Sequence, residues 1–163
     1  MAEENLQTAA EGVQPEFSVQ KLYVNDLSFE APHLPEIFQE QYAPQINMEM
    51  NAKNRAVGQD IYEVVLAITV TSKIGEKTAF LAEVHQAGIF VIKGLDELSM
   101  RHALQAFAPN VLFPYAREAI SSLVARGGFP PLLLQPVNFD ALFAAQIQRE
   151  QAAAAAPATE SVQ

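Results

Sequence analysis

The sequence predicts an α+β fold in which helices pack on one face of a four-stranded antiparallel sheet. Two observations support this prediction: four segments with strand-like alternation precede residue 93, and the segments after it show helical spacing, caps and stops. A sheet with one apolar face needs a layer packed on that face and can leave the other face in water. The chain of 163 residues, 50% of them hydrophobic, is long enough for one domain with a core.

Residues 61–92 carry the strongest strand signal, and we interpret them as two strands joined by a tight turn. In both strands the even-numbered positions hold the fuller apolar set, and the odd-numbered positions include Glu63 and Glu83. This period of two is typical of pleated strands. The turn is expected at residues 73–76, where Gly75 can adopt the positive φ that a hairpin loop needs.

Two further strands and a long connection are expected before this hairpin. Residues 17–29 form a strand with imperfect alternation, which a bulge, or burial on both faces at a subunit contact, would produce. Residues 31–44 contain three prolines and are expected to form a crossover loop with a helical turn at residues 35–41. Residues 45–53 alternate most cleanly and predict the next strand.

The part of the chain after residue 94 is expected to form the helical layer. Residues 95–107 predict a helix with Asp96 as its N-cap. Pro114 does not fit inside an unbroken helix, so the following helix is expected to start near it or to kink there. Gly127 and Gly128 predict the end of that helix.

The last segments are an extended strap and a final helix. Residues 129–137 contain three prolines and three leucines, which predicts an extended and largely buried segment. Asn138 is expected to cap a helix over residues 139–151. The predicted organisation is a disordered acidic arm at residues 1–15, one folded domain at residues 16–151 and a disordered Ala-rich tail at residues 152–163.

Composition narrows the classes of function. The formal net charge of −9 argues against a nucleic-acid surface, and an acidic field attracts basic partners, although solubility alone also explains it. The chain has no cysteine, no apolar run long enough to span a bilayer and no start like that of a signal peptide. We therefore expect a cytoplasmic protein that does not insert into membranes.

The polar residues do not form a recognisable catalytic or metal-binding motif. His33, His85 and His102 lie outside the spacings of zinc sites, and the sequence has no phosphate-binding glycine loop and no nucleophile elbow. His85 shares a strand face with Glu83 and would suit a general acid–base pair, but a wet sheet face explains two polar residues there more simply. We expect no enzymatic activity, no cofactor and no resident metal ion.

Two surfaces remain as candidates for function. Outward strand positions collect acidic residues around Leu81, which would suit a basic peptide, the alternative being an ordinary solvated sheet face. These acidic residues are Asp26, Glu30, Glu49, Glu63 and Glu83. Methionine and aromatic side chains are expected to meet where the crossover loop and the last helix flank the sheet, the alternative being core packing. These positions are Tyr42, Met48, Met50, Phe143 and Ile147.

Five segments form a specific combination along the chain. They are YVNDLSFEAPHLP, EVVLAITVT, KTAFLAEVHQAGIFVI, APNVLFPYARE and GGFPPLLLQPVNFDALF. Together they resemble the SecB protein-export chaperones of Gram-negative bacteria, in the order and at the spacing of that family. The resemblance covers residues 17–151 and neither of the two tails.

The resemblance implies a cytosolic homotetramer, a dimer of dimers, that binds unfolded secretory precursor proteins without ATP and passes them to the SecA motor. It implies that clients lie in apolar grooves, for which the candidates are Tyr42, Met48, Met50, Phe143 and Ile147. It also implies that the basic, zinc-carrying C-terminal tail of SecA binds the acidic outer sheet face at Asp26, Glu30, Leu81 and Glu83. The zinc belongs to that partner, because this chain lacks a ligand set for it.

One position departs from the family pattern, and two other functions stay open. His85 stands where a neutral polar residue is expected. One alternative is a SecB-like interaction protein dedicated to a single partner, such as a toxin–antitoxin pair, which would not bind many unfolded chains. The other is a small hydrolase that uses His85 and Glu83, which would lose all function in His85→Ala.

Overall fold

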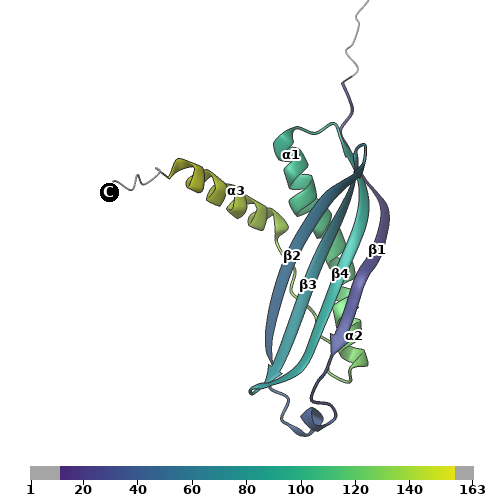
Figure 1. Ribbon diagram of the computed structural model, residues 1–163, viewed down its shortest axis with the longest axis vertical. Coiled ribbons are helices and arrows are strands. Elements are labelled where there is room, and N and C mark those ends of the chain that lie inside the picture. The colour runs from purple at the N-terminus through teal and green to yellow at the C-terminus, as the bar shows by residue number, and fades with distance from the viewer. Residues whose placement is uncertain (1–11, 157–163) are drawn as a thin grey trace, which may run out of the picture.

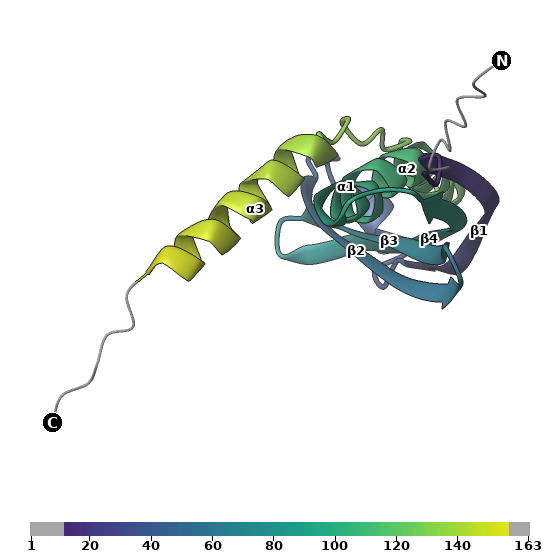
Figure 2. The ribbon, with the colours of Figure 1, turned by 90° about the horizontal axis from the view of Figure 1, so that it is seen from above.

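The computed structural model describes residues 12–156 and contains one antiparallel sheet of four long strands (Figure 1). The strands are β1 (Glu16–Glu30), β2 (Gln45–Gly58), β3 (Ile61–Ile74) and β4 (Lys77–Lys93). Their order across the sheet is β1-β4-β3-β2, so β1 and β2 form the two edges. The helices α1 and α2 cover one face of this sheet (Figure 2), which confirms the predicted α+β class.

The hairpin of β3 and β4 forms the centre of the sheet, as its alternation predicted. Alternate side chains of β3 are fully buried while their neighbours stay partly exposed; the buried ones are Val64, Leu66, Ile68 and Val70. The turn is tighter than the predicted residues 73–76, because Ile74 pairs with Lys77 and leaves only Gly75 and Glu76 in the loop. Gly75 has a φ of 60°, a left-handed conformation that favours glycine.

β1 departs from regular pairing at two bulges. Its register with β4 shifts between Val19 and Lys21 and again between Val24 and Asp26. An extra residue at a bulge shifts the side chains beyond it to the opposite parity along the strand. This explains the imperfect alternation of residues 17–29 and confirms the bulge interpretation.

The connection from β1 to β2 crosses the end of the sheet, because the two strands lie on opposite edges (Figure 1). It contains a 3-10 turn, Glu36–Gln39, in which Ile37 is buried. This turn lies within residues 35–41, where a helical turn was predicted. β2 then continues to Gly58, beyond the predicted strand end at residue 53.

The helical layer begins with three segments that follow one another without a break. They are α1 (Glu97–His102), a π-helical segment (Ala103–Phe107) and α2 (Ala108–Arg126). Asp96 caps the first of them as predicted, since the backbone N–H of Ser99 donates to Asp96 Oδ1 at 2.7 Å.

Pro114 lies inside α2, so a helix start near it is wrong, and the alternative of a kink at Pro114 stays a prediction. A proline cannot donate to the carbonyl four residues earlier, here that of Asn110. Pro114 and Asn110 are both exposed, so water can satisfy the freed carbonyl and the helix continues. Gly127 and Gly128 follow the last residue of α2 as predicted, and Gly128 has a φ of 85°.

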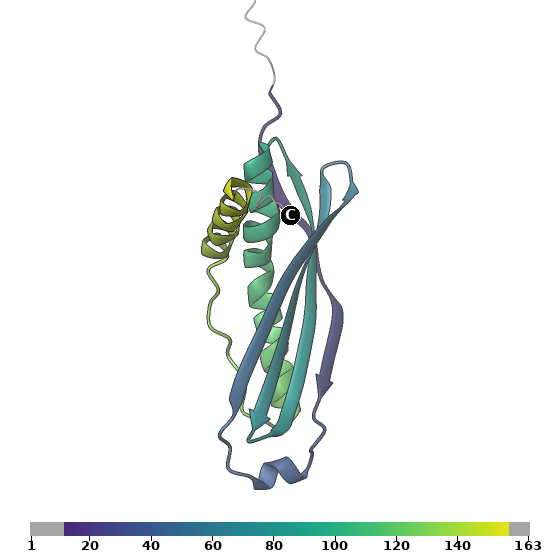
Figure 3. The same ribbon diagram turned by 60° about the vertical axis from the view of Figure 1, so that its left-hand side comes forward.

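The core lies between α2 and the central strands, which form two layers in side view (Figure 3). Large side chains from both layers are fully buried there, among them Leu66, Ile68, Phe80, Phe90, Leu112 and Ile120. Fully burying one such side chain stabilises the fold by about 1.5–3 kcal/mol. The strap at residues 129–137 runs back beside α2 in extended form, with Phe129 and Leu134 buried (Figure 3).

The last helix, α3 (Phe139–Ala155), projects away from the two layers (Figures 1 and 2). Asn138 caps it as predicted, because Asn138 Oδ1 accepts from the backbone N–H of Ala141 at 3.0 Å. Phe139 is its one buried residue, and the helix continues past the predicted end at residue 151.

Two predictions concern the ends of the chain. Most of the predicted arm at residues 1–15 and of the predicted tail at residues 152–163 lies outside the described residues. Within residues 12–156, no helix is both long and apolar enough to cross a membrane.

Candidate interaction surfaces

Four residues that were predicted to bind a basic partner come together on the outer face of the sheet. Strand pairing places Asp26 of β1 opposite His85 of β4, and Glu30 opposite Leu81. Glu83 lies between the two β4 positions and points to the same face, because side chains alternate along a strand. We call Asp26, Glu30, Leu81 and Glu83 the acidic patch.

His85 is the polar neighbour of this patch. Its Nε2 lies 2.6 Å from Glu83 Oε1, and polar atoms of Asp26, Glu83 and His85 all lie within 4.8 Å of one another. Among the described residues this is the one such group of three. An imidazole and two carboxylates offer lone pairs that can bind a cation. Asp26 is exposed and the other two are half-buried, so the group can be reached by a cationic side chain of a partner.

Glu63 lies on the outer face as expected, where it lines a cavity together with Arg55 and His85, but its carboxylate is already paired there. Its side chain is only 13% exposed and accepts from Arg55 Nε and from the hydroxyl of Tyr23, each at 2.5 Å. Arg55 first, and then Tyr23, hold the pKa of Glu63 below its ordinary value. Burial, reinforced by Glu63, raises the pKa of Tyr23 to about 12.

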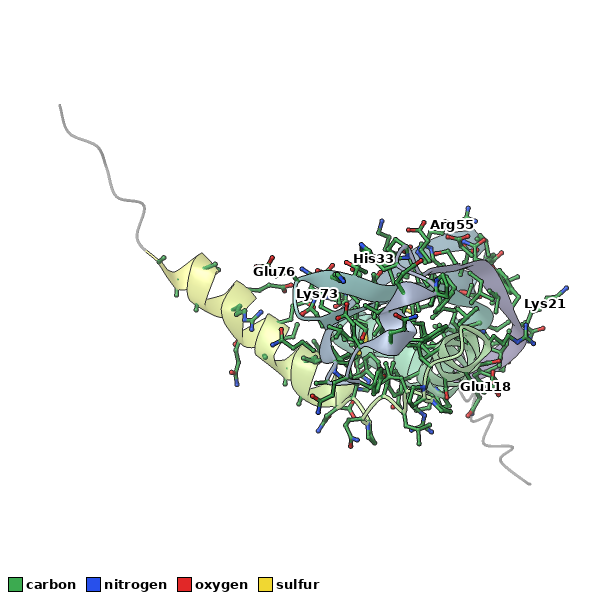
Figure 4. All side chains as sticks on the ribbon, turned by 90° about the horizontal axis from the view of Figure 1, so that it is seen from below. Lys21, His33, Arg55, Lys73, Glu76 and Glu118 are labelled. Carbon is green, nitrogen blue, oxygen red and sulfur yellow. The ribbon has the colours of Figure 1, made fainter. Side chains whose placement is uncertain are left out.

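A shallow cavity of about 530 Å³ lies on the outer face beside the acidic patch. Its lining is rich in amides and holds Lys53 and Arg55 besides His85 and Glu63, the last of which pairs with Arg55. Arg55 lies on the sheet side of the molecule, away from Glu118 on the helix side (Figure 4). The outer face therefore carries the acidic patch over β1 and β4 and mixed charges over β2, where Glu49 shares the face of Lys53 and Arg55.

The five candidates for a client groove do not meet in one pocket. Met50 and Phe143 line a cavity of about 400 Å³ between β2 and α3. Tyr42 lines a separate cavity of about 190 Å³ beside the crossover loop, together with Phe38 and Phe129. The structure thus brings two of the five together and places Tyr42 at another site.

Apolar side chains of β2 lie between these two cavities. Ile46 and Met48 are 41% and 40% exposed, and Met48 pairs with the buried Val70, which places it on the helix-covered face. Ile147 lies one turn beyond Phe143 on α3 and is half-buried. The helix side of β2 is therefore an apolar surface with a cavity towards each end.

Sequence reasoning missed several residues of these surfaces. Phe38 and Phe129 form one wall of the smaller cavity, with ring centroids 5.2 Å apart. An aromatic residue in a proline-rich loop was a usable signal for Phe38. Gln105 lines the larger cavity and gave no signal, because a glutamine in a helix is usually a solvated residue.

Comparisons with known proteins agree over nearly the whole chain. A family model described as "Preprotein translocase subunit SecB" matches residues 10–150. The "Protein-export protein SecB" of Ectopseudomonas mendocina (strain ymp) is 57% identical over 150 residues, which cover 92% of this chain and 93% of that protein. The protein of the same description from Pseudomonas aeruginosa (strain LESB58) is 55% identical, with 100% of both chains covered.

One solved structure shares the fold at low sequence identity. It is a Mycobacterium tuberculosis SecB-like chaperone in complex with a ChAD peptide from an antitoxin. The TM-score is 0.60 at 17% identity, and the match covers 74% of this chain and 90% of that chain. This likeness supports the arrangement of sheet and helices described above.

Proposed function

Because the chain belongs to the SecB family of protein-export chaperones, we propose that it is an ATP-independent holdase that keeps unfolded precursor proteins competent for export. The observation that carries this proposal is the family match over residues 10–150. Two surfaces of the structure support this proposal, and we assign one to the client and the other to the export motor.

Exposed apolar side chains on the helix side of β2 support client binding. Ile46 and Met48 lie between the cavity of Tyr42 and the cavity of Met50 and Phe143. An unfolded chain can bury apolar side chains against this surface at about 25 cal/mol per Å². A folded protein has already buried its own apolar side chains, so binding selects unfolded chains. Several weak contacts along one client add avidity without sequence specificity.

The acidic patch supports delivery to SecA. Glu30 lies opposite Leu81 and Glu83 follows it on the same face, while Asp26 lies beside Glu83 and His85, an arrangement that suits a basic peptide with an apolar side chain. The basic, zinc-carrying C-terminal tail of SecA is the partner we propose for this patch, and opposite charges accelerate such encounters. The patch lies on the outer face and the client surface on the helix face, so both partners can be bound at once.

The proposal includes assembly as a cytoplasmic homotetramer, a dimer of dimers. β1 is an edge strand, and its side chains Val19, Val24 and Leu27 are exposed. An edge strand presents unpaired backbone groups that a second copy can pair with, and association would cover these apolar side chains.

The alternative of a chaperone dedicated to one partner has less support. The SecB-like chaperone with an antitoxin peptide shares 17% identity with this chain. Identity at this level supports a shared fold and not a shared partner. The export proteins described above share 55–57% identity over nearly the whole chain.

The experiment that tests the proposal follows light scattering while an unfolded, reduced secretory precursor is diluted with and without the protein, in the absence of ATP. We expect suppression of aggregation at a stoichiometric ratio of tetramer to client, undiminished in His85→Ala. Loss of all function in that variant would favour the hydrolase that uses His85 and Glu83. No suppression at several-fold excess would contradict the holdase, and binding of a single partner only would favour the dedicated interaction protein.

A further inference from the structure

The cavity between β2 and α3 has an unusual polar lining. None of its lining side chains is charged, and the polar ones are all amides, namely Asn51, Asn54, Gln105 and Gln146. A side-chain amide carries both donor and acceptor groups, as a peptide group does, so it can pair with a main chain of any sequence. This chemistry suits a site that receives unfolded chains.

Gln105 differs from the other amides of this lining. Its Oε1 is buried and has no hydrogen-bond partner within the described part of the chain. Burying an acceptor without a partner is unfavourable, and native structures seldom do so. Gln146, by contrast, is exposed and donates to Glu150 Oε1 at 3.1 Å.

The backbone around Gln105 is a second, independent observation. The residue lies in the middle of the π-helical segment Ala103–Phe107, between α1 and α2. Such segments are rare and occur frequently at functional sites, because the wider turn redirects side chains. Here the segment directs Gln105 into the lining of the cavity rather than towards water.

α3 forms one wall of the cavity, and few contacts hold it against the body of the protein. Phe139 is its one buried residue. Phe143 packs partly buried beside His102, and two polar pairs between partly exposed side chains complete the contact, Asp140 with His102 at 2.6 Å and Glu150 with Arg101 at 2.8 Å. Exposed polar pairs contribute little to stability, so we expect outward displacement of α3 to cost little when a chain enters the cavity.

We propose that Gln105 Oε1 accepts a hydrogen bond from a main-chain N–H of the bound client. An extended, unfolded segment has unpaired N–H groups, whereas the N–H groups of helices and paired strands are already bonded. Gln105 would thus select an unpaired backbone in addition to apolar side chains. This inference rests on the proposed chaperone function and identifies the main-chain N–H as the group of the client that the site recognises.

The test uses a labelled, uncharged apolar peptide and a set of copies that are each N-methylated at one backbone amide. N-methylation removes one donor and keeps every side chain. Wild-type protein should bind one of these copies about tenfold more weakly, the factor that corresponds to one lost hydrogen bond. Gln105→Met should bind the parent peptide about tenfold more weakly and should no longer discriminate against that copy, as a double-mutant cycle requires.

Matched variants make the result decisive. Gln105→Met should fold at least as stably as the wild type, because it removes an unpaired buried acceptor. Gln105→Asn withdraws the amide by one methylene group and should lose the same discrimination, while Gln146→Met should keep it. Equal affinity of wild type and Gln105→Met for the parent peptide would overturn the inference and leave the chaperone proposal intact. Failure of the wild type to bind any unfolded precursor would overturn the proposed function itself.

Discussion

The hydroxyl of Tyr23 on β1 donates to Glu63 on β3 at 2.5 Å and reaches across β4 to do so. The β4 residue opposite Tyr23 is Ala87, whose small side chain leaves room for the tyrosine ring. The other oxygen of Glu63 accepts from Arg55 on β2. A single carboxylate therefore links both edge strands to the centre of the sheet.

Glu63→Gln should lower the free energy of unfolding by about 1–2 kcal/mol at neutral pH, because two donors lose a charged acceptor. The pKa of Glu63 is lowered in the folded protein, first by Arg55 and then by Tyr23. A carboxyl group of this kind stabilises the fold above its ordinary pKa of 4.5, and that contribution is lost as the pH falls through its lowered folded pKa. Urea unfolding of both proteins between neutral pH and strong acid measures this contribution. If Glu63→Gln remained less stable than the wild type by the same amount in strong acid, the role of the Glu63 charge would be contradicted.

Tyr23→Phe should show the opposite pH dependence. Burial and Glu63 raise the pKa of Tyr23 to about 12, so the folded protein holds this proton more tightly than the unfolded chain. The stabilisation is fully present below the ordinary value of 10 and is lost as the pH rises through about 12. Wild type should exceed Tyr23→Phe by about 1 kcal/mol below pH 10, with the difference closing above it. In a Glu63→Gln background the difference should be smaller, and an unchanged difference there would contradict this coupling.

The proposed SecA site can be tested with isosteric, charge-neutral variants. Glu83→Gln and Asp26→Asn each remove one charge from the acidic patch at nearly constant side-chain size. We expect each to weaken binding of a zinc-loaded SecA tail peptide about fivefold, the effect of about 1 kcal/mol for an exposed ion pair. Calorimetric titration should also show that wild-type protein binds the peptide more weakly at higher salt. Both variants should still suppress aggregation of an unfolded precursor.

Glu76→Gln is the matched control for these variants. Glu76 lies in the β3–β4 turn, outside the acidic patch, and Figure 4 shows it apart from Arg55. It changes the net charge by the same amount outside the acidic patch. Equal weakening by Glu76→Gln would mean that net charge, rather than the patch, attracts the peptide.

The strands were predictable because burial on one face imposes a period of two on their side chains. Val64, Leu66, Ile68 and Val70 repeat this period without interruption, and each is buried. Pro114 misled the prediction because a helix can continue through a proline where the freed carbonyl is hydrated, although the proline ring also crowds that carbonyl. Local pattern does not show that Asn110 remains exposed.

The surfaces were predictable to different degrees for a physical reason. Asp26 and Glu83 lie on neighbouring strands, so alternation and the pairing of those strands bring them together. Met48 and Met50 share a strand face too, yet only Met50 lines the larger cavity, because the cover over β2 depends on where α3 lies. The lining position of Gln105 depends on a π-helical turn that has no sequence signature.

Gly127→Ala should destabilise the protein although the backbone there is ordinary. Gly127 has a φ of −73°, which alanine adopts readily. A Cβ at this position, however, would lie 2.2 Å from Phe29 Cζ of β1. Overpacking of this kind lowers the free energy of unfolding by about 1–3 kcal/mol, which urea unfolding would measure. Phe29→Leu should recover part of that loss in the double variant, and a fully additive double variant would contradict the clash.

Asn138 connects the capping of α3 to the proposed client site. Its side chain holds the first turn of the helix that carries Phe139 and Phe143 to the cavity. Asn138→Ala should weaken that helix start by about 1 kcal/mol and lower the affinity for an apolar client peptide several-fold.

Amide exchange along α3 should accelerate in Asn138→Ala while exchange in β3 and β4 stays slow, because α3 contributes a single buried side chain to the core. Glu63→Gln lowers the free energy of unfolding by a similar amount on the outer face of the sheet, away from α3, and should leave client affinity unchanged. Equal loss of affinity in Asn138→Ala and Glu63→Gln would mean that general stability, rather than the position of α3, controls client binding.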